Sequence, residues 1–472
     1  MTVRPSMWDG SNAAVGIESI AAEYGTADDP KAVQRMRDAL VALCLRMGWG
    51  DSADAPFANV IRDGDRVVIK PNWVLHENKQ PGEGFESLVT HGVVLRALAE
   101  LALTTGASQV LLGDAPVQSC QFDTMIANSG LTTFFSEAHT RDPRLVGPVD
   151  FRRTVSSLAG AVRVAREDTR ELSQYVKFDL GAESYLEPIT DADAEFRVTQ
   201  YPPDLMKETH RRGRHQYLVA REILDADVVI NVPKLKTHKK AGVTCALKNL
   251  VGINGNKEFL PHHRIGGPAV GGDCYPENSV VKRSLEQVLD MQNATKSAGL
   301  QTVLGFAGRV LYSLAHRAGD VTGVEGAWSG NDTVWRMCLD LNRIIQYGRA
   351  DGGIDTRRQR RVVNVVDAVI AGHGDGPLAP KALPLGLLMA GENSAAVDWV
   401  SALLLGFDAT RIPIALHAFD PGPWPLAAFS PTDIVVHTAG GSVPVARYQP
   451  PRLGVTLDYP AGWRDAVAGS TA

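Results

Sequence analysis

The most constraining feature of the sequence is a short apolar run that leads directly into a cluster of basic residues. Residues 226–232 read Ala-Asp-Val-Val-Ile-Asn-Val, a pattern typical of a strand buried on both faces. Pro233 ends the run, and five lysines and one histidine lie between residues 234 and 248. In open α/β sheets, ligands bind beyond the carboxyl ends of the strands. The stretch therefore predicts a site for an anion, which the local positive charge would attract.

Two further predicted strands also end at polar residues. Residues 66–70 and 109–112 are β-branched or leucine-rich runs, and an amphipathic helix over residues 91–105 separates them. This pattern predicts a β–α–β unit with parallel strands and a right-handed crossover. Asn72 follows the first strand and Asp114 ends the second, so both are expected near the basic cluster.

The rest of the chain predicts an α/β fold of two lobes, each a mostly parallel sheet flanked by helices, with a large insertion. The first lobe covers residues 1–280, and the insertion occupies about 121–215, where no clear period is found. The second lobe covers residues 281–472 and begins with a helical segment over 280–318, whose apolar stripe is expected to face the core. Strands over 362–370 and 385–390 follow, and a helix over 394–405 comes next.

Charge and hydropathy narrow the class of partner. The formal net charge is −5, which argues against a nucleic-acid-binding protein and favours a small anionic substrate at the local basic cluster. No apolar run reaches the length of a membrane span, and residues 1–24 lack the apolar core of a signal peptide. We expect a soluble, cytoplasmic protein.

The candidate site residues fall into three groups. Expected substrate ligands for a carboxylate or phosphate are Lys70, Asn72, Lys234, Lys236, Thr237 and Thr244. Expected catalytic residues are His91, His238 and Lys248. Candidate metal ligands are His262, His263, Asp114 and Asp375. We expect Lys234 and Lys236 in an exposed loop, and a helix from Thr244 that directs Lys248 back toward His238.

Each group has a simpler interpretation. A lysine cluster is often a solvated loop, His91 could be a surface residue at a helix start, and Asp114 could cap a turn. Adjacent histidines such as His262 and His263 point in different directions, which weakens them as a metal pair.

The motifs resemble those of the DUF362 family. The resemblance is carried by Val232–His238, by Gly242–Thr244 and by the run Leu247-Lys248-Asn249-Leu250-Val251-Gly252. Shorter motifs agree in order: Val68–Asn72, Thr90-His91, Gly113–Pro116, Gly374–Pro377 and Ala396–Asp398. Many members carry a ferredoxin-like cluster segment, which this sequence lacks. The family name assigns no general function.

A more distant resemblance implies a chemistry. Residues 238–248 are similar to the His-x₂-Ala-Gly-Phe-Ser-Gly-Gly-Ala-Lys stretch of the nickel-pincer lactate racemase family, with the same spacing from His to Lys. The resemblance implies a covalent cofactor anchor at Lys248, proton-transfer bases at His91 and His238, and a nickel ligand at His262 or His263. The paired glycines of that family are replaced here by Cys245 and Ala246.

These observations favour an enzyme acting on a small anionic, hydroxyl-bearing substrate, with racemase, epimerase or redox-isomerase chemistry. One alternative is a transferase or lyase assisted by magnesium or manganese, with Asp114 and Asp375 as oxygen ligands. Another is a non-catalytic protein that binds a ligand or metal. The cofactor is open among nickel, magnesium and manganese.

The cysteine pattern generates the first prediction. The five cysteines are scattered, and no two are separated by only two residues, so neither an iron–sulfur cluster nor a disulfide framework is expected. The anaerobically purified protein should therefore show no broad visible absorbance of the iron–sulfur type. Stoichiometric iron together with acid-labile sulfide would contradict this prediction.

Overall fold

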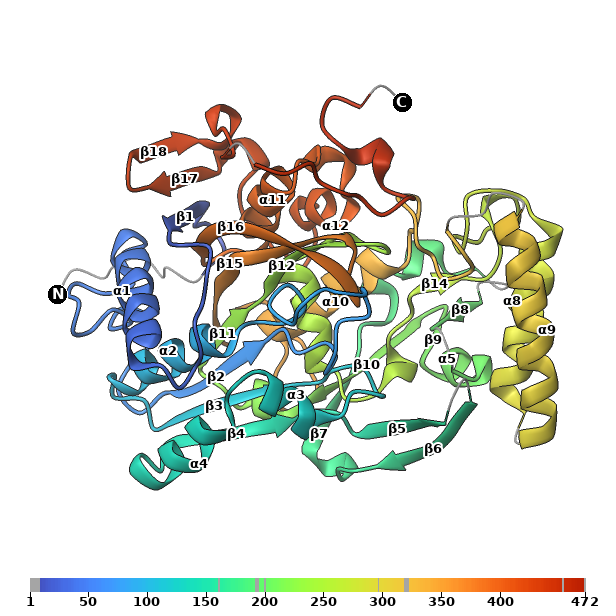
Figure 1. Cartoon of the computed structure of the whole chain (residues 1–472), viewed down its shortest axis with the longest axis horizontal. Coiled ribbons are helices and arrows are strands. Elements are labelled where there is room, and N and C mark those ends of the chain that lie inside the picture. Colours follow the sequence, from blue (N-terminus) through green and yellow to red (C-terminus); the bar gives the residue numbers. More distant parts are fainter. Residues whose placement is uncertain are drawn as a thin grey trace.

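The chain folds around one large mixed sheet. The computed structural model describes residues 9–159, 162–191, 195–198, 201–295, 297–317, 322–451 and 454–470. Eleven strands from both halves of the chain form the sheet, and helices cover both of its faces (Figure 1). The predicted α/β class is confirmed. The strands expected to form a second sheet belong to the same sheet as those of the first lobe.

The sheet follows the order β18, β17, β1, β16, β15, β11, β2, β3, β4, with β12 beside β15 and β13 paired to β12. The bounds are β1 Ala14–Ser19, β2 Arg66–Pro71, β3 Gln109–Asp114, β4 Leu145–Asp150, β11 Val228–Val232, β12 Lys234–His238, β13 Gly242–Thr244, β15 Arg361–Asp375, β16 Ala379–Gly391, β17 Val435–Thr438 and β18 Gly441–Pro444. Because β11 is parallel to both β2 and β15, it joins the strands of the two predicted lobes. The predicted β–α–β unit is present, since β2 and β3 are parallel.

Alternate residues of the central strands pack on opposite faces. Val67 and Ile69 belong to a cluster with α1 (Pro30–Arg46) and α2 (Gly92–Leu103), whereas Val68 belongs to a second cluster on the other face. A strand that is buried on both faces needs apolar side chains at successive positions, and the sequence of β2 has them.

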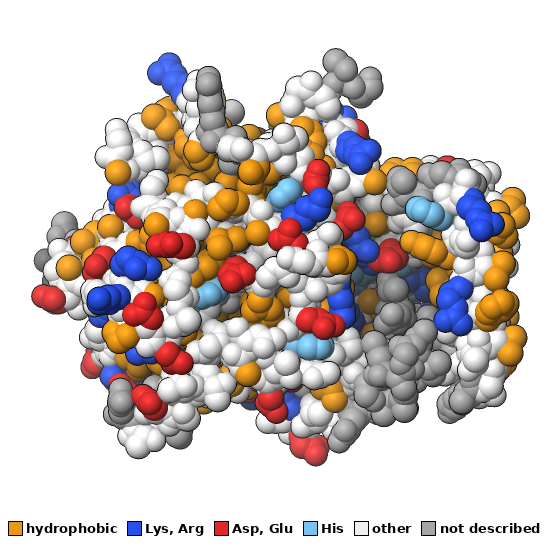
Figure 2. All heavy atoms as spheres, viewed as in Figure 1, with side chains coloured by type: hydrophobic (Ala, Val, Ile, Leu, Met, Phe, Trp, Pro, Cys, Tyr) orange, Lys and Arg blue, Asp and Glu red, His pale blue; other side chains and the backbone are white. Residues whose placement is uncertain are grey.

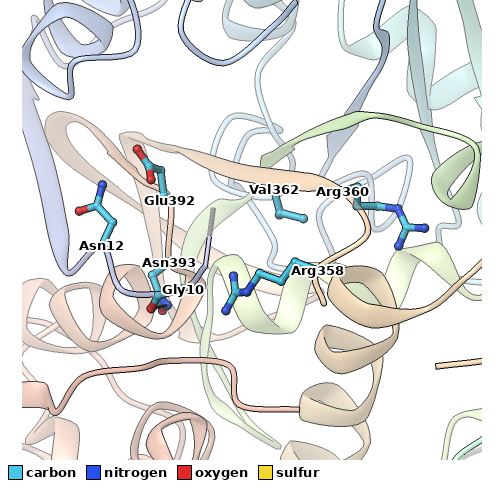
Figure 3. A pocket seen from close by; sticks show the side chains of 7 residues that line it. All are labelled: Gly10, Asn12, Arg358, Arg360, Val362, Glu392 and Asn393. Atoms are coloured by element: carbon cyan, nitrogen blue, oxygen red, sulfur yellow. Dashed lines mark hydrogen bonds between the residues drawn. The ribbon is translucent and has the colours of Figure 1, made fainter. Parts of the chain in front are cut away.

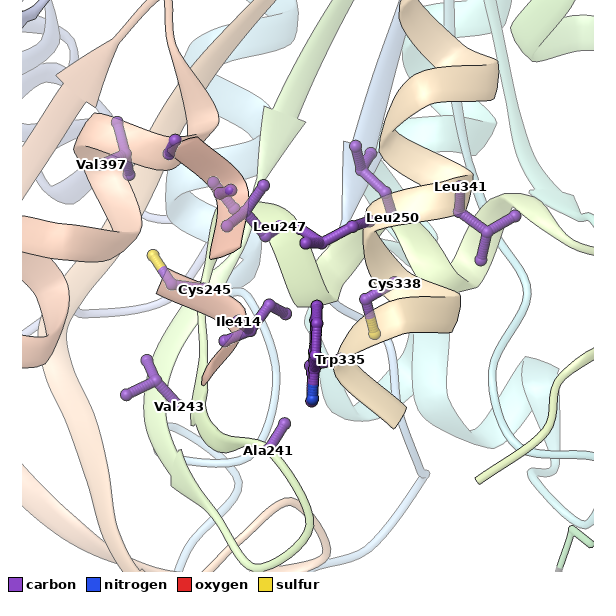
Figure 4. Packing of buried hydrophobic residues seen from close by; sticks show 14 of the residues in the cluster. Ala241, Val243, Cys245, Leu247, Leu250, Trp335, Cys338, Leu341, Val397 and Ile414 are labelled. Atoms are coloured by element: carbon purple, nitrogen blue, oxygen red, sulfur yellow. The ribbon is translucent and has the colours of Figure 1, made fainter. Parts of the chain in front are cut away.

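The second cluster fixes the segment that carries Lys248. Its helices are α7 (Ala246–Asn249), α10 (Val334–Tyr347), α11 (Ser394–Leu404) and α12 (Pro413–Leu416). Figure 4 shows Leu247 and Leu250 lying between Trp335 of α10 and Val397 of α11. Tight packing of these buried side chains gives Lys248 a rigid base.

The predicted insertion is only partly separate from the sheet. It contains α3 (Phe122–Asn128) and α4 (Thr132–Arg141), and β4, which pairs with β3. Three smaller sheets follow β4: the hairpin of β5 (Thr154–Ala159) and β6 (Val162–Asp168), the sheet of β7 (Tyr175–Asp179), β10 (Arg214–Ala220) and β9 (His210–Arg211), and the pair of β8 (Phe196–Arg197) and β14 (His263–Arg264). The short helices α5 (Pro203–Thr209) and α6 (Arg221–Leu224) flank β9 and β10, and α6 and β14 lie beyond the predicted insertion.

The helical segment forms a hairpin of α8 (Val280–Ala294) and α9 (Ala298–Arg317) that projects to one side (Figure 1). The expected core-facing stripe of α9 is wrong in part, because Val310 and Leu314 are exposed. The hairpin has its own small cluster of Cys274, Tyr275, Leu285 and Val324. Figure 2 shows a hollow between this hairpin and the body, with basic and acidic side chains around it. No helix in the described ranges is long and apolar enough to cross a membrane.

A buried ion pair holds β12 in the sheet. The predicted exposed loop at Lys234–His238 is instead a strand, and all five of its residues are buried. Lys234 Nζ lies 2.7 Å from Asp367 of β15 and also donates to the Tyr24 hydroxyl at 2.7 Å. Asp367 also accepts hydrogen bonds from the Tyr24 hydroxyl and from the His91 amide. The expected exposed position of Lys234 is therefore wrong.

Lys234→Met tests how much the buried ion pair contributes to stability. The substitution keeps the side-chain volume but leaves the Asp367 carboxylate buried without its cation, which should lower the free energy of unfolding by about 3–5 kcal/mol. Denaturant titration measures the change. The matched control is Lys381→Met, which breaks the exposed pair with Asp458 and should cost less than about 1 kcal/mol. Equal effects of the two variants would contradict the structural role of the buried pair.

Candidate functional site

Strands β12 and β13 bring several predicted ligands together. Lys236 and His238 are two residues apart, so they share a side of β12, and Lys236 pairs across the ladder with Thr244. Lys236 and Thr244 are both buried, and Thr244 Oγ1 has no hydrogen-bond partner within the described part of the chain. Thr237 points the other way and donates to the Gly374 carbonyl at 2.7 Å. Its expected role as a substrate ligand therefore finds no geometric support.

Lys248 is the neighbour that the other basic groups share. Its positive charge contributes to lowering the pKa of Lys70, Lys236, His238, Lys240 and His262, in each case after the larger effect of burial. Lys248 is half-buried, and its amine makes no hydrogen bond or ion pair with any residue that the structure describes. The fold thus leaves the charge of this amine without a partner among the described residues.

Positive charge in this cluster exceeds the negative charge around it. Lys70 pairs with Asp114 at 2.6 Å, and Lys240 lies 3.6 Å from Glu325. Lys236 donates to the Leu88 carbonyl and has no carboxylate at ion-pair distance in the described ranges. Burial, and then Lys234 and Lys248, hold the pKa of Lys236 well below its ordinary value. An anion would relieve this repulsion.

Asp114 acts as a partner for Lys70. It also accepts hydrogen bonds from the backbone amides of Trp73 and Ala115, at 2.7 and 2.9 Å. Gly252 allows the close approach, because a Cβ there would lie 1.9 Å from Asp114 Oδ1. These contacts occupy both carboxylate oxygens, so Asp114 fits a structural role better than the predicted metal ligand.

Asn249 links the ends of β2 and β11. Its amide nitrogen donates to Asn231 Oδ1 at 2.8 Å, and its oxygen accepts from Asn72 at 3.0 Å and from Lys70 at 3.3 Å. Asn72 Oδ1 is left buried without a hydrogen-bond partner within the described part of the chain. Asn72 therefore has an unused acceptor beside the basic cluster.

The hydrogen bonds of His238 define its tautomer. Nδ1 accepts from the backbone amides of Lys240 and Ala241, at 3.0 and 3.1 Å. Burial, and then Lys248, hold the pKa of His238 well below its ordinary value, so the ring is neutral near pH 7. The remaining proton is on Nε2. His238 therefore presents a hydrogen-bond donor, and the expectation of a free general base does not match this geometry.

His262 has the opposite tautomer. Its Nδ1 donates to the Leu260 carbonyl at 2.7 Å, which leaves the lone pair on Nε2. Burial, and then Lys240 and Lys248, hold its pKa well below the ordinary value. The ring is half-buried and neutral, so His262 Nε2 can accept a proton or bind a metal.

His91 lies in the network of Asp367. Its Nδ1 accepts from the Val93 amide at 3.2 Å and caps α2, and its ring stacks on Tyr24 with centroids 3.8 Å apart. Burial lowers its pKa to about 4. Thr90, the residue before it, does not cap the helix, since Thr90 Oγ1 donates to the Val232 carbonyl. These contacts assign His91 a structural role at the helix start.

The other predicted metal ligands are not brought together. Asp375 is exposed at the end of β15, and neither it nor Asp114 belongs to a group of three metal-type ligands in the described ranges. His263 lies with Cys274 and Glu286 in a group that does not include His262. Of the four candidate metal ligands, only His263 therefore belongs to such a group in the described ranges.

One pocket lies at the opposite end of the central strands. Gly10, Asn12, Val362 and Glu392 line it, together with Arg358, Arg360 and Asn393 (Figure 3). Val362 is near the amino end of β15, whereas Lys70 and Asp114 stand at the carboxyl ends of β2 and β3. The pocket is thus separate from the basic cluster.

Sequence reasoning missed Lys240, Asn249 and Gly252 as site residues. Lys240 continues the alternation of Lys236 and His238, so reading this run as a strand would have included it. Asn249 and Gly252 stand within the quoted family motif, but their contacts are made with Lys70 and Asp114, far away in the sequence.

A family model matches residues 153–402, and its description is a domain of unknown function, DUF362. The chain belongs to the DUF362 family. The predicted membership is confirmed, and the match includes Lys236, His238, Lys248 and His262. Lys70, Asn72 and Asp114 lie before it.

Other known proteins are similar over parts of the chain. A thylakoid-associated protein of Synechocystis sp. is 27% identical over 212 residues, which cover 45% of this DUF362 chain and 46% of that protein. The chain thus matches about half the length of this curated relative.

Two solved structures show weak likeness. A protein from Thermotoga maritima has a TM-score of 0.35 at 9% identity, covering 79% of this chain and 58% of that one. The lactate racemase apoprotein from Thermoanaerobacterium thermosaccharolyticum has a TM-score of 0.30 at 11% identity, covering 85% of this chain and 59% of that one. At these scores neither likeness carries an argument about the site.

The lowered pKa of His238 predicts how stability depends on pH. The unfolded chain takes up a proton near pH 6.5 whereas the folded chain does not, so stability is lost as the pH falls below that value. One such group can change the free energy of unfolding by at most about 1.4 kcal/mol per pH unit. His238→Asn keeps an acceptor for the two amides and removes the titration, so its unfolding free energy should fall less between pH 7 and pH 5.

Denaturant titrations at several pH values measure this slope. The control is His437→Asn, at a partly buried position of β17 outside the basic cluster, and the slope should change more in His238→Asn than in this variant. A slope in His238→Asn as steep as in the wild type would contradict the assignment.

Proposed function

We propose that this DUF362 protein is an enzyme that binds a small anionic, hydroxyl-bearing substrate in the basic cluster and transfers a proton on it. The observation that carries the proposal is that Lys248, whose amine has no partner in the described ranges, is close enough for its charge to lower the pKa values of Lys70, Lys236, His238, Lys240 and His262, after the larger effect of burial.

Substrate binding follows from the unmet charge and hydrogen-bonding capacity. Lys236 and Lys248 supply cations for a carboxylate or phosphate. Thr244 Oγ1 and Asn72 Oδ1 are buried without partners in the described ranges, so they can bond to the substrate's polar groups. A neutral ligand would leave the lysine repulsion uncompensated.

The two histidine tautomers support proton transfer. His262 Nε2 is the candidate base for a proton on the carbon or hydroxyl beside the bound anionic group. His238 Nε2–H is the candidate donor to an oxygen that gains negative charge. This pair replaces the expected pair of His91 and His238, and it favours racemase, epimerase or redox-isomerase chemistry.

The residues fit part of the cofactor set that the nickel-pincer resemblance implies. Lys248 would hold the cofactor covalently, because its amine is unpaired in the described ranges, and His262 would supply a metal ligand through Nε2. Cys245 does not obstruct this side, since its sulfur contacts Ser401 of α11 at 3.1 Å. The bound group would supply an electron acceptor for redox isomerisation.

Oxygen-ligand chemistry with magnesium or manganese has less support. Asp114 is engaged by Lys70 and two backbone amides, and Asp375 is exposed.

Lysine substitutions test the anion site with oxalate and inorganic phosphate as probes. Lys236→Met and Lys248→Met should each weaken binding by about 1–3 kcal/mol, which is roughly 5- to 150-fold, as measured by calorimetry. Lys236→Met should also keep a Tm at or above that of the wild type, because it removes a buried cation that has no carboxylate partner in the described ranges.

Two controls accompany these variants. Lys177→Met, on an exposed position of β7, should bind both probes as the wild type does. Lys248→Arg keeps the charge and should retain anion binding, while losing any turnover that needs a lysine nucleophile. Wild-type affinity for both probes in Lys236→Met and Lys248→Met would exclude the proposed substrate site.

A further inference from the structure

We propose that His263, Cys274 and Glu286 form a binding site for a divalent transition metal of the zinc class. One ring nitrogen of His263, the Cys274 sulfur and one Glu286 oxygen all lie within 4.8 Å of one another. The three come from β14, from the loop after it and from α8. This set differs from the adjacent-histidine pair that the sequence suggested.

The three donors suit one kind of ion. Imidazole nitrogen, thiolate sulfur and carboxylate oxygen are all zinc ligands, and three protein ligands with an open fourth position are typical of catalytic zinc sites. Hard cations such as magnesium and calcium prefer oxygen ligands alone. The chemistry of the set therefore favours zinc, or cobalt as its spectroscopic substitute.

An unpartnered buried nitrogen indicates that a ligand belongs here. His263 is 5% exposed, and its Nδ1 has no hydrogen-bond partner in the described part of the chain. Such atoms are rare in folded proteins, because a buried polar atom without a partner costs free energy.

Outer contacts orient the carboxylate. The Tyr275 hydroxyl donates to Glu286 Oε2 at 2.9 Å, and the Gly266 amide donates to Oε1 at 3.0 Å. Metal ligands are usually fixed by second hydrogen bonds of this type. Because Glu286 is held by α8 and by these donors, it has a defined position before any ion arrives.

The charges balance when the ion binds. The Cys274 thiol lies beside Glu286, and when the ion binds, the thiol releases its proton to solvent and becomes a thiolate. A divalent ion then faces one thiolate, one carboxylate and one neutral imidazole, so the group carries no net charge. The nearby Lys240 is already compensated by Glu325.

The position of the site explains what the ion would do. Cys274 belongs to the small apolar cluster of the α8–α9 hairpin, which has only three other buried members in the described ranges. Small cores commonly need a metal or a disulfide for stability. The ion would join the hairpin to β14, directly after His262, and so hold one wall of the proposed substrate site.

Cobalt binding tests the proposal on the full-length protein after treatment with a chelator. The wild type should bind one equivalent of Co²⁺ with a thiolate-to-cobalt charge-transfer band and the visible bands of a tetrahedral site, and Zn²⁺ should displace it. Cys274→Ala should lose the charge-transfer band and bind Co²⁺ at least 10-fold more weakly. Cys120→Ala, at a buried cysteine whose sulfur lies near Met125, should behave as the wild type.

A measurement on the wild type alone guards against misfolded variants. Zn²⁺ should raise the Tm and slow amide hydrogen exchange in α8. Absence of stoichiometric Co²⁺ and Zn²⁺ binding by the wild type would overturn the proposal. So would an unchanged charge-transfer band in a folded Cys274→Ala.

Discussion

The ion pair between Lys234 and Asp367 is the interaction on which the geometry of the site depends. It fixes β12 against β15 at the point where β11 ends, and it connects Tyr24 and the start of α2 to the same carboxylate. Once Lys234 is fixed, the alternation of the strand directs Lys236 and His238 to one side. A rigid strand can hold these polar groups in position more precisely than a loop could.

The site concentrates cations where burial opposes their charge. Lys70 and Lys240 have acidic partners, whereas Lys236 and Lys248 have no carboxylate at ion-pair distance in the described ranges. Natural proteins sacrifice stability at functional sites in this way, because groups that must meet a ligand cannot also be satisfied by the fold. Lys234 has a carboxylate partner, whereas Lys236 has none in the described ranges, so two lysines of one strand differ in role: the first supports the fold, and the second is available to the proposed substrate.

Much of the fold could be predicted because its signals are local. The β-branched runs at β2, β3, β11 and β15 and the amphipathic pattern of α2 each lie within one stretch of sequence. The joining of both halves into one sheet was not predictable, since β11 contacts β2 and β15 across more than a hundred residues. The turn formers around Lys234–His238 suggested a loop, and the pairing with β15 overrode that local preference.

The site was predictable in its residue types and less so in their roles. The motif identified Lys236, His238 and Lys248, but the tautomers of His238 and His262 depend on amides and a carbonyl whose positions only the fold sets. His91 appeared reactive in the sequence because nothing there shows its bond to Val93 or its stacking on Tyr24.

The opposite tautomers of His238 and His262 give the site a fixed direction. In the proposed site, a ligand between the two rings would meet a proton donor on one side and a proton acceptor on the other. Two mirror-image molecules anchored by the same carboxylate would present their hydroxyl and hydrogen to these rings in opposite order. If the proposed substrate binds there, the pair would distinguish left-handed from right-handed ligands, and interconverting the two hands would require both rings to exchange a proton during each turnover.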